Sequence, residues 1–137
     1  MTCPFCDVAQ GRAKAHVVYE DDAFIGFLDH RPLFEGHVLL VPRAHVPTLG
    51  ELDLAHAPAL VQAVQRLMRA IEAALGAAGT FVATNNKVSQ SVAHLHVHIV
   101  PRRPKDGLKG FFWPRTTYGS EARMEEVAAM LRARVET

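Results

Sequence analysis

The sequence has few cysteines and no excess of charge of one sign. Only two of its 137 residues are cysteines, and 15 basic side chains against 14 acidic ones leave a net charge of +1. These features exclude a disulfide scaffold and a broad electrostatic surface for nucleic acid or anionic lipid. No apolar run approaches the roughly 20 residues that span a bilayer, and the first residues lack the pattern of a signal peptide. We therefore expect a cytoplasmic protein with no nucleic-acid and no membrane partner.

The composition is that of a folded domain. Hydrophobic residues make up 49% of the chain and charged residues 21%, a balance typical of globular proteins. A chain of this length suits a single domain, 1–137, with a moderate core. Within it, we expect residues 104–119 to form a loop or interface segment and residues 120–135 a C-terminal helix.

Apolar patterning predicts five strands. Residues 16–29 contain two short β-prone runs around an acidic turn at 20–22, and residues 36–42, 80–86 and 94–101 supply three more. Runs of strands joined by short turns, with one long helix inserted, favour an antiparallel sheet with helices on one face. The expected fold class is α+β, with a five-stranded antiparallel sheet, one long helix and a C-terminal helix.

Two helices are expected from apolar residues at three-and-four spacing. The long one lies between the third and fourth strands, with Pro58 in its first turn and Gly76 at its exit. Its apolar residues are Leu60, Val61, Val64, Leu67, Met68, Ile71 and Leu75. Ser120 can cap the second helix, whose inner stripe is Met124, Val127, Ala128, Leu131 and Val135.

Three histidines open the last expected strand, in the run HLHVHIV. His94, His96 and His98 alternate with apolar residues, so they share one face of a strand and lie roughly 6.5–7 Å apart. Neutral imidazole is both a nucleophile and a metal ligand. The histidines could therefore hold a catalytic zinc ion, attack a phosphate, or simply decorate a solvated face. Three histidines in five residues favour chemistry over decoration.

Two further blocks accompany this row. The segment FLDHRPLFEGHVLLVPRAH places an Asp before a Pro-containing turn and a histidine at the start of a strand that ends in Val-Pro-Arg-x-His. The segment NNKVSQSVAHLHVHIVPR places Asn, Gln and Ser before the histidines. Together these motifs resemble the histidine-triad (HIT) superfamily of nucleotide hydrolases and transferases, over most of the chain to about Arg103. The resemblance implies cleavage of nucleotide phosphoramidates or dinucleoside polyphosphates at the α-phosphate, with a purine nucleotide as the expected substrate.

The resemblance also implies a role for individual residues. His96 would be the nucleophile that forms a covalent nucleotidyl-histidine, His98 and His37 would donate hydrogen bonds to the phosphate, and Ser91 would donate to the leaving group. The implied substrate-binding residues are Asp29 at the ribose, Asn85 and Gln90 before the triad, and Phe5, Phe27 and Leu39 around the base. Taken singly, each of these residues could serve only a turn, a loop or the core.

One segment departs from the family pattern. Many family members have a longer, glycine-containing loop between the Asn and the Gln, whereas this chain has Asn85-Asn86-Lys87-Val88-Ser89-Gln90. The approach of this loop to the phosphate can therefore differ. Strand alternation lets only one of Asn85 and Asn86 face the site, and we favour Asn85.

The two cysteines form a C-x-x-C pair near the N-terminus. In related bacterial-type proteins such cysteines join two histidines, and matching this chain to them gives the ligand set Cys3, Cys6, His45 and His94. Four protein ligands make a closed site, so the resemblance implies a structural Zn²⁺ ion. A redox dithiol is the alternative, but the pair does not stand at the strand-to-helix junction of a thioredoxin-like site.

Residues 102–119 mix basic and aromatic side chains. Such a segment could stack single-stranded nucleic acid, but with a near-neutral chain we favour a loop folded over the site or buried between subunits. The resemblance implies a symmetric homodimer in which Phe111, Phe112 and Trp113 approach the neighbouring site.

Two rival functions stand beside the enzyme. One is a nucleotide-binding scaffold with incidental hydrolysis, and the other is a metallohydrolase with zinc at the triad. For the proposed reaction we expect loss of turnover after substitution of His96, with nucleotide binding largely retained. Full activity of the variant would reject that reaction, and strong inhibition by a chelator without unfolding would favour a catalytic metal.

Overall fold

The structure, a computed structural model, describes residues 2–109 and 115–135. The chain divides into two compact units, Met1–Asp106 and Gly107–Thr137, and each is described by itself. The aromatic triplet Phe111, Phe112 and Trp113 lies outside the described residues. None of the helices in the described ranges has the length and apolar character needed to cross a membrane.

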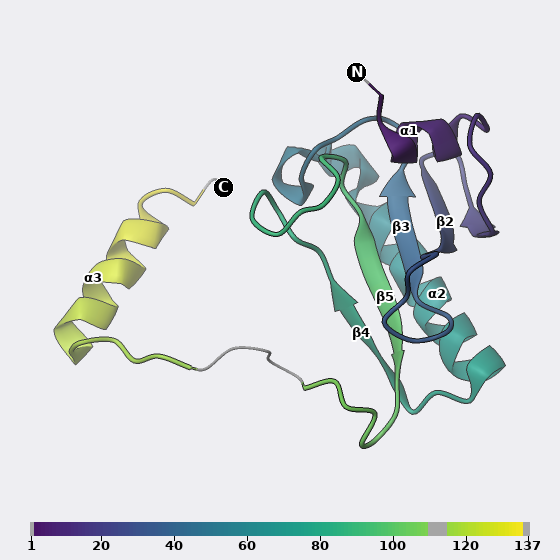
Figure 1. The fold of residues 1–137 in the computed structure, drawn as a ribbon. Helices are drawn as coiled ribbons and strands as arrows, with labels where there is room; N and C mark the ends of the chain where they lie inside the picture. The colour runs from purple at the N-terminus through teal and green to yellow at the C-terminus, as the bar shows by residue number, and fades with distance from the viewer. Residues whose placement is uncertain (1, 110–114, 136–137) are drawn as a thin grey trace. The chain divides into compact units, whose positions relative to one another are not determined.

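The first unit is built on an antiparallel sheet (Figure 1). In the described residues its five strands are β1 (Val17–Glu20), β2 (Phe24–Leu28), β3 (Val38–Pro42), β4 (Gly79–Ala83) and β5 (Val97–Arg102). They are arranged in the order β1-β2-β3-β5-β4, and every neighbouring pair is antiparallel. The predicted fold class, α+β with a five-stranded antiparallel sheet and two principal helices, is confirmed.

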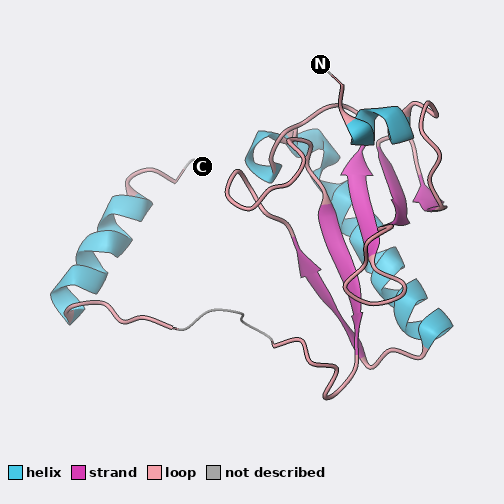
Figure 2. Cartoon of the chain, viewed as in Figure 1, coloured by secondary structure: helices cyan, strands magenta, loops and turns pink. Residues whose placement is uncertain are grey.

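Two of these strands are shorter than their sequence patterns predict. β4 ends at Ala83, and a long loop leads from it to β5 (Figure 2). β5 begins only at Val97, because the preceding residues leave the sheet: the amide of Leu95 donates to the carbonyl of Val46, 2.6 Å away, in the loop after β3. The first two histidines of the triad therefore lie just before the strand, and the third lies within it.

One face of the sheet packs against α2 (Ala57–Leu75). This helix has a proline in its first turn and ends at Gly76, whose φ of 62° is left-handed. It buries Leu60, Ala63, Leu67 and Ile71 against a core that includes Phe24, Leu40, Val97 and Ile99. The predicted stripe is correct at Leu60, Leu67 and Ile71, whereas Val61 is 54% exposed because it lies one residue further round the helix.

The opposite face packs against α1 (Pro4–Ala9), a short helix that the sequence patterns did not predict. Its N-terminus is capped by Cys3, whose Sγ accepts from the amide of Cys6 at 3.4 Å. Phe5, Val8 and Ala9 of α1 pack on a second core of Ile25, Phe27, Leu39 and Val41. The C-x-x-C motif is thus wound into a helix on the face that carries the triad.

The second unit contains α3 (Glu121–Arg132). Ser120 caps it as predicted, accepting from the amide of Arg123 at 3.0 Å. The predicted inner stripe is not buried: none of the residues of α3 is buried, and Met124 and Leu131 are 44% and 62% exposed. Two single-turn 3₁₀ helices, Leu49–Glu51 and Leu54–His56, complete the described elements in the segment before α2.

Candidate active site and metal centre

His94 stands where the N-terminal helix meets the sheet. Its ring is fully buried, and its Nε2–H donates to the carbonyl oxygen of Pro42 at 2.8 Å. Because a carbonyl can only accept, the proton is on Nε2 and Nδ1 carries the lone pair. That nitrogen lies 3.3 Å from Cys3 Sγ and 3.5 Å from Cys6 Sγ. Burial lowers the pKa of His94, which favours the neutral ring that a metal requires.

His45 completes a group of four potential ligands. Its Nδ1 lies 3.3 Å from Cys6 Sγ, and one ligand atom from each of the four residues lies within 4.8 Å of every other. Zinc–sulfur and zinc–nitrogen bonds of about 2.3 and 2.0 Å place tetrahedral ligands roughly 3.3–3.8 Å apart. The donor set and its spacing therefore fit a closed Cys₂His₂ site, and the structure brings together all four residues that the resemblance implies.

The second histidine of the triad is oriented by the main chain of the first. His96 is 3% exposed, and its Nδ1–H donates to the carbonyl oxygen of His94 at 2.8 Å. The proton is therefore held on Nδ1, and the lone pair is on Nε2. The ring of Phe5 packs edge-on against it, with 5.0 Å between centroids. An imidazole held in this tautomer presents a nucleophilic nitrogen without needing a base to deprotonate it.

The third histidine of the triad is hydrogen-bonded to His37, which directly precedes β3. The amide of Leu33 donates to His37 Nδ1 at 3.1 Å, so the proton of the neutral His37 ring is on Nε2. His37 Nε2–H then donates to His98 Nδ1 at 2.9 Å, which leaves the proton of His98 on its own Nε2. Burial, reinforced by the neighbouring histidines, lowers the pKa of His98 to about 4. His98 is thus held as a neutral hydrogen-bond donor.

A carboxylate stands beside this pair. Asp29 Oδ2 lies 3.7 Å from His37 Nε2, while its Oδ1 accepts from the amide of Arg31 at 2.9 Å. Asp29, His37 and His98 also lie close enough together to hold a metal ion. The tautomers argue against this use, because His37 Nε2 carries the proton that His98 accepts and has no lone pair for a metal. Burial lowers the pKa of His37, and Asp29 opposes that shift.

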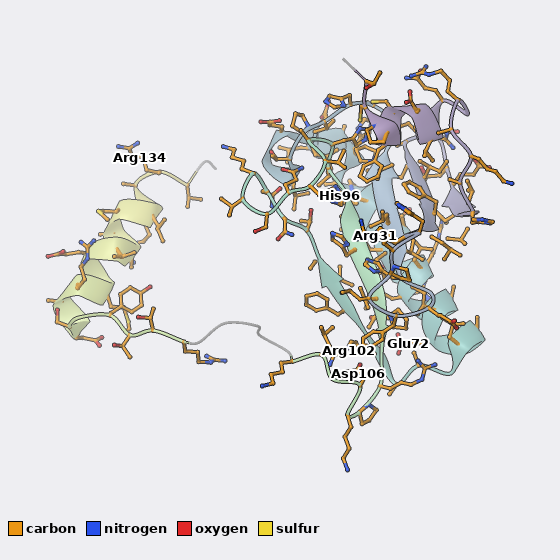
Figure 3. The ribbon with its side chains drawn as sticks, in the orientation of Figure 1. Arg31, Glu72, His96, Arg102, Asp106 and Arg134 are labelled. Atoms are coloured by element: carbon orange, nitrogen blue, oxygen red, sulfur yellow. The ribbon has the colours of Figure 1, made fainter. Side chains whose placement is uncertain are left out.

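These side chains open into one pocket of about 380 Å³. It is lined by the predicted residues Phe5, Phe27, Asp29, Leu39, Ser91, His96 and His98 and by Pro4, His30, Arg31 and Val92. His37 lies behind His98 and is not among its lining residues. Figure 3 shows His96 and Arg31 on the same side of the sheet. The pocket combines apolar walls with histidines, a carboxylate and a hydroxyl, a lining typical of small-molecule sites.

The amides before the triad brace loops rather than line the pocket. Asn85 Nδ2 donates to the carbonyl of Ser89 at 3.2 Å, and Asn86 Oδ1 accepts from the amide of Leu49 at 2.8 Å. Gln90 accepts from the amide of Lys87 at 2.8 Å and donates to the carbonyl of Pro47 at 2.6 Å. The loop contains no glycine, and Lys87 and Ser89 adopt φ of 73° and 60°. The Gln90 bond to the Lys87 amide supports this strained turn.

Two pocket residues, His30 and Arg31, were absent from the sequence prediction of the site. Both are exposed at the loop between β2 and β3 and line the pocket beside Asp29. The amide of Arg31 donates to Asp29 Oδ1, so Asp29 also forms the turn that precedes Pro32. The sequence did contain a signal for Arg31: it is a cation close to Asp29, the expected ribose ligand, and guanidinium groups commonly bind phosphate.

The fold and the site together define an α+β protein with a histidine triad, a class whose members bind and hydrolyse nucleotides. Comparison with family models gives a match to the HIT domain over residues 10–105, well over half of the chain. The chain therefore belongs to the HIT family, as the sequence resemblance predicted.

Relatives include a hydrolase and a zinc-bound protein. The adenylylsulfatase HINT3 of Arabidopsis thaliana is 35% identical over 108 residues, which are 77% of this chain and 55% of HINT3. A crystal structure of a HIT family member from Bacillus subtilis matches with a TM-score of 0.90 at 28% identity, over 100% of this chain and 99% of that one. A Zn-bound histidine triad protein from Mycobacterium smegmatis is 35% identical, with a TM-score of 0.74 over 97% and 92%.

Proposed function

We propose that the protein is a nucleotide hydrolase or nucleotidyl transferase that works through a covalent nucleotidyl-His96. The observation that carries this proposal is the bond from His96 Nδ1–H to the carbonyl of His94. It leaves Nε2 with a lone pair, on a ring that lines a nucleotide-sized pocket. Splitting one displacement into two lowers each barrier.

In the first step, His96 Nε2 attacks the α-phosphorus and the bond from phosphorus to the leaving group breaks. A P–N bond to His96 forms as the leaving group departs. A leaving amine takes a proton that the Ser91 hydroxyl relays from solvent, whereas a leaving phosphate departs as an anion with Ser91 donating a hydrogen bond to it. His98 Nε2–H donates to an equatorial oxygen, where charge develops, and His37 holds His98 in the donor tautomer. In the second step, water or another hydroxyl acceptor attacks phosphorus and gives its proton to solvent, the P–N bond breaks, and His96 Nε2 regains its lone pair.

Substrate binding follows from the walls of the pocket. Phe5, Phe27 and Leu39 grip the base by contact area, which suits a purine, and the free lone pairs of Asp29 can accept from the ribose hydroxyls. Two substrate classes fit: nucleotide phosphoramidates with a P–N bond and dinucleoside polyphosphates with a P–O–P bond. HINT3 is an adenylylsulfatase, and adenylyl sulfate is a third compound with a leaving group on the α-phosphorus.

We further propose that Cys3, Cys6, His45 and His94 hold a structural Zn²⁺. Their donor types and spacing support this, and a relative from Mycobacterium smegmatis is zinc-bound. Bound zinc would fix α1 to the sheet, and it would leave no open position for water. Two free cysteines suit a reducing compartment, so we also propose a cytoplasmic location. We propose a homodimer as the working form, with a small-molecule nucleotide as substrate.

The central test compares wild type with His96→Gly on an adenosine phosphoramidate and on a dinucleoside tetraphosphate. We expect kcat to fall by at least about a thousandfold, because no other group replaces the nucleophile, while the affinity for AMP changes little. Mass spectrometry of rapidly quenched wild type should show one nucleotidyl group, absent from His96→Gly. Val18→Ala, on exposed β1, is the matched control. Unchanged turnover by His96→Gly would overturn the mechanism.

A further inference from the structure

The metal ligands and the nucleotide pocket share structural parts. Phe5 stands between the two cysteines in sequence and lines the nucleotide pocket. Its ring packs edge-on against Phe27, His94 and His96, with centroid distances of 5.7, 5.9 and 5.0 Å. One aromatic ring therefore touches the base wall, a metal ligand and the nucleophile.

A second connection runs through the main chain. His94 presents Nδ1 to the cysteines, and its carbonyl oxygen accepts the Nδ1–H of His96 at 2.8 Å. Its ring is fixed from the other side by the bond from Nε2 to Pro42. Movement of His94 would therefore displace the acceptor that selects the tautomer of His96. The residue that anchors the metal also orients the nucleophile.

The helix that carries these contacts is weak on its own. α1 has only six residues, none of them buried, and helices this short are unstable in isolation. Its position depends on Phe5 and Val8 packing on the second core, and on ligation of the cysteines that begin it. If the cysteines held no metal, a nucleotide that binds against Phe5 would itself have to order α1.

The metal centre also opens to solvent. Cys3, Cys6 and His45 line a second pocket of about 530 Å³, and Pro4 and Val92 line both this pocket and the nucleotide pocket. The two sites are therefore neighbours across a shared wall. An ion can reach its ligands without passing through the nucleotide site, so metal and nucleotide can bind in either order.

We propose that the metal centre and the nucleotide site are thermodynamically coupled, with Phe5 and the His94 carbonyl as the positioning groups that link them. This inference rests on the proposed zinc and nucleotide sites, but it does not require hydrolysis. Bound zinc would hold α1 against the sheet, and so would favour the Phe5 position and the His96 tautomer to which the nucleotide binds. By linkage, the nucleotide must raise the affinity for zinc by the same factor as zinc raises the affinity for the nucleotide.

The test measures binding of AMP, by calorimetry, to the zinc-loaded and the chelator-stripped protein. We expect stripping to weaken AMP binding by at least about fivefold, the lower end of typical couplings. Competition against a chromophoric chelator should show AMP tightening Zn²⁺ binding by the same factor. Nitrogen-15 NMR of the imidazoles should show His96 protonated on Nδ1 in the loaded protein and as a tautomer mixture after stripping, a change that mere loss of stability would not produce.

Variants keep the test decisive if the stripped protein unfolds. Phe5→Ala should retain one zinc per chain, bind AMP more weakly and show a smaller metal dependence. Val18→Ala, which changes a half-exposed residue of β1 that lines neither pocket, should change neither the AMP affinity nor its dependence on zinc. Equal AMP affinities with and without zinc, or full coupling in Phe5→Ala, would overturn this inference alone. Failure of the loaded protein to bind AMP, or of the protein to bind zinc, would overturn the proposed sites and the coupling together.

Discussion

Main-chain groups distinguish the histidines of this site from one another. The carbonyl of Pro42 places the proton of His94 on Nε2, and the carbonyl of His94 places that of His96 on Nδ1. The amide of Leu33 donates to Nδ1 of His37, so the proton of His37 is on Nε2. In the proposed reaction and metal site, these bonds would suit His94 to be a metal ligand, His96 a nucleophile and His98 a hydrogen-bond donor. Side-chain chemistry is set here by backbone geometry.

The lowered pKa of His98 predicts how stability depends on pH. The unfolded chain binds a proton on this histidine below about pH 6.5, whereas the folded protein excludes it until about pH 4. The unfolded state therefore gains protons first, and the free energy of unfolding falls as pH drops from 6.5 to 4. His37, whose pKa burial also lowers, acts in the same direction. The slope per proton is at most about 1.4 kcal/mol per pH unit, less where solvent reaches the ring.

Urea unfolding of zinc-loaded protein at half-unit pH steps would measure this slope. His98→Asn should show a shallower slope than wild type between pH 6.5 and 4. The control is His16→Asn, which changes an exposed histidine directly before β1. Any loss of zinc at low pH would affect both variants alike, so a difference between their slopes belongs to His98. Parallel curves for wild type and His98→Asn would show that His98 does not carry the dependence.

The limits of sequence reasoning are visible at the same residues. Strand alternation applies only to His98, because β5 begins at Val97 and the rings of His94 and His96 are placed by the segment before it. The family motifs named the four potential metal ligands that the structure gathers. The contact between His37 and His98 joins residues 61 positions apart and depends on the register of β3 against β5. The bracing role of Gln90 depends equally on two loops meeting. Local pattern contains neither fact, because both arise from tertiary packing.

At the scale of elements, the two helices of the first unit form for different reasons. α2 follows from apolar periodicity and from its proline and glycine ends, so the sequence predicts it. α1 has six residues, too few to display a period, and its cap is a cysteine rather than the usual Ser, Thr, Asp or Asn. Its position comes from packing on the second core, and in the proposed metal site also from ligation, so apolar periodicity does not predict it.

The turn that leads into β3 contains the glycine whose replacement should matter most. Gly36 has a φ of 99°, and a Cβ there would lie 2.2 Å from Leu75 Cδ1. Leu75 is 41% exposed and can rotate away, so the backbone strain should dominate. We expect Gly36→Ala to lower the free energy of unfolding by about 1–2 kcal/mol, as measured by urea denaturation.

Gly79→Ala is the matched control for this change. Gly79 begins β4, and a Cβ there meets nothing within 4 Å. Gly79 does not have a positive φ. Alanine there should therefore leave the free energy of unfolding unchanged or raise it slightly. Because Gly36 directly precedes His37, Gly36→Ala should also lower kcat more than Gly79→Ala does. Equal stability of the two variants would contradict the strain argument.

For the molecule as a whole, the two faces of the sheet have separate tasks. The α2 face carries the larger core, and the α1 face carries both the four potential metal ligands and the pocket. In the described residues β4 lies at one edge of the sheet. Beside it, a groove of about 270 Å³ is lined by apolar side chains of α2 and β4, including Val61 and Val82, which are 54% and 39% exposed. Exposed apolar surface next to an open strand edge is a typical interface.

We expect the proposed homodimer to use this groove and strand edge. An edge strand of one copy can pair antiparallel with the same strand of a second copy about a two-fold axis, which makes the surface self-complementary. Light scattering should give the mass of two chains for wild type, and Val61→Lys with Val82→Lys should shift it towards one chain. Leu54→Lys changes a residue that is 87% exposed and outside the groove, so that variant should remain dimeric. A double variant that kept the wild-type mass would place the interface elsewhere, and a monomeric wild type would rule out the dimer.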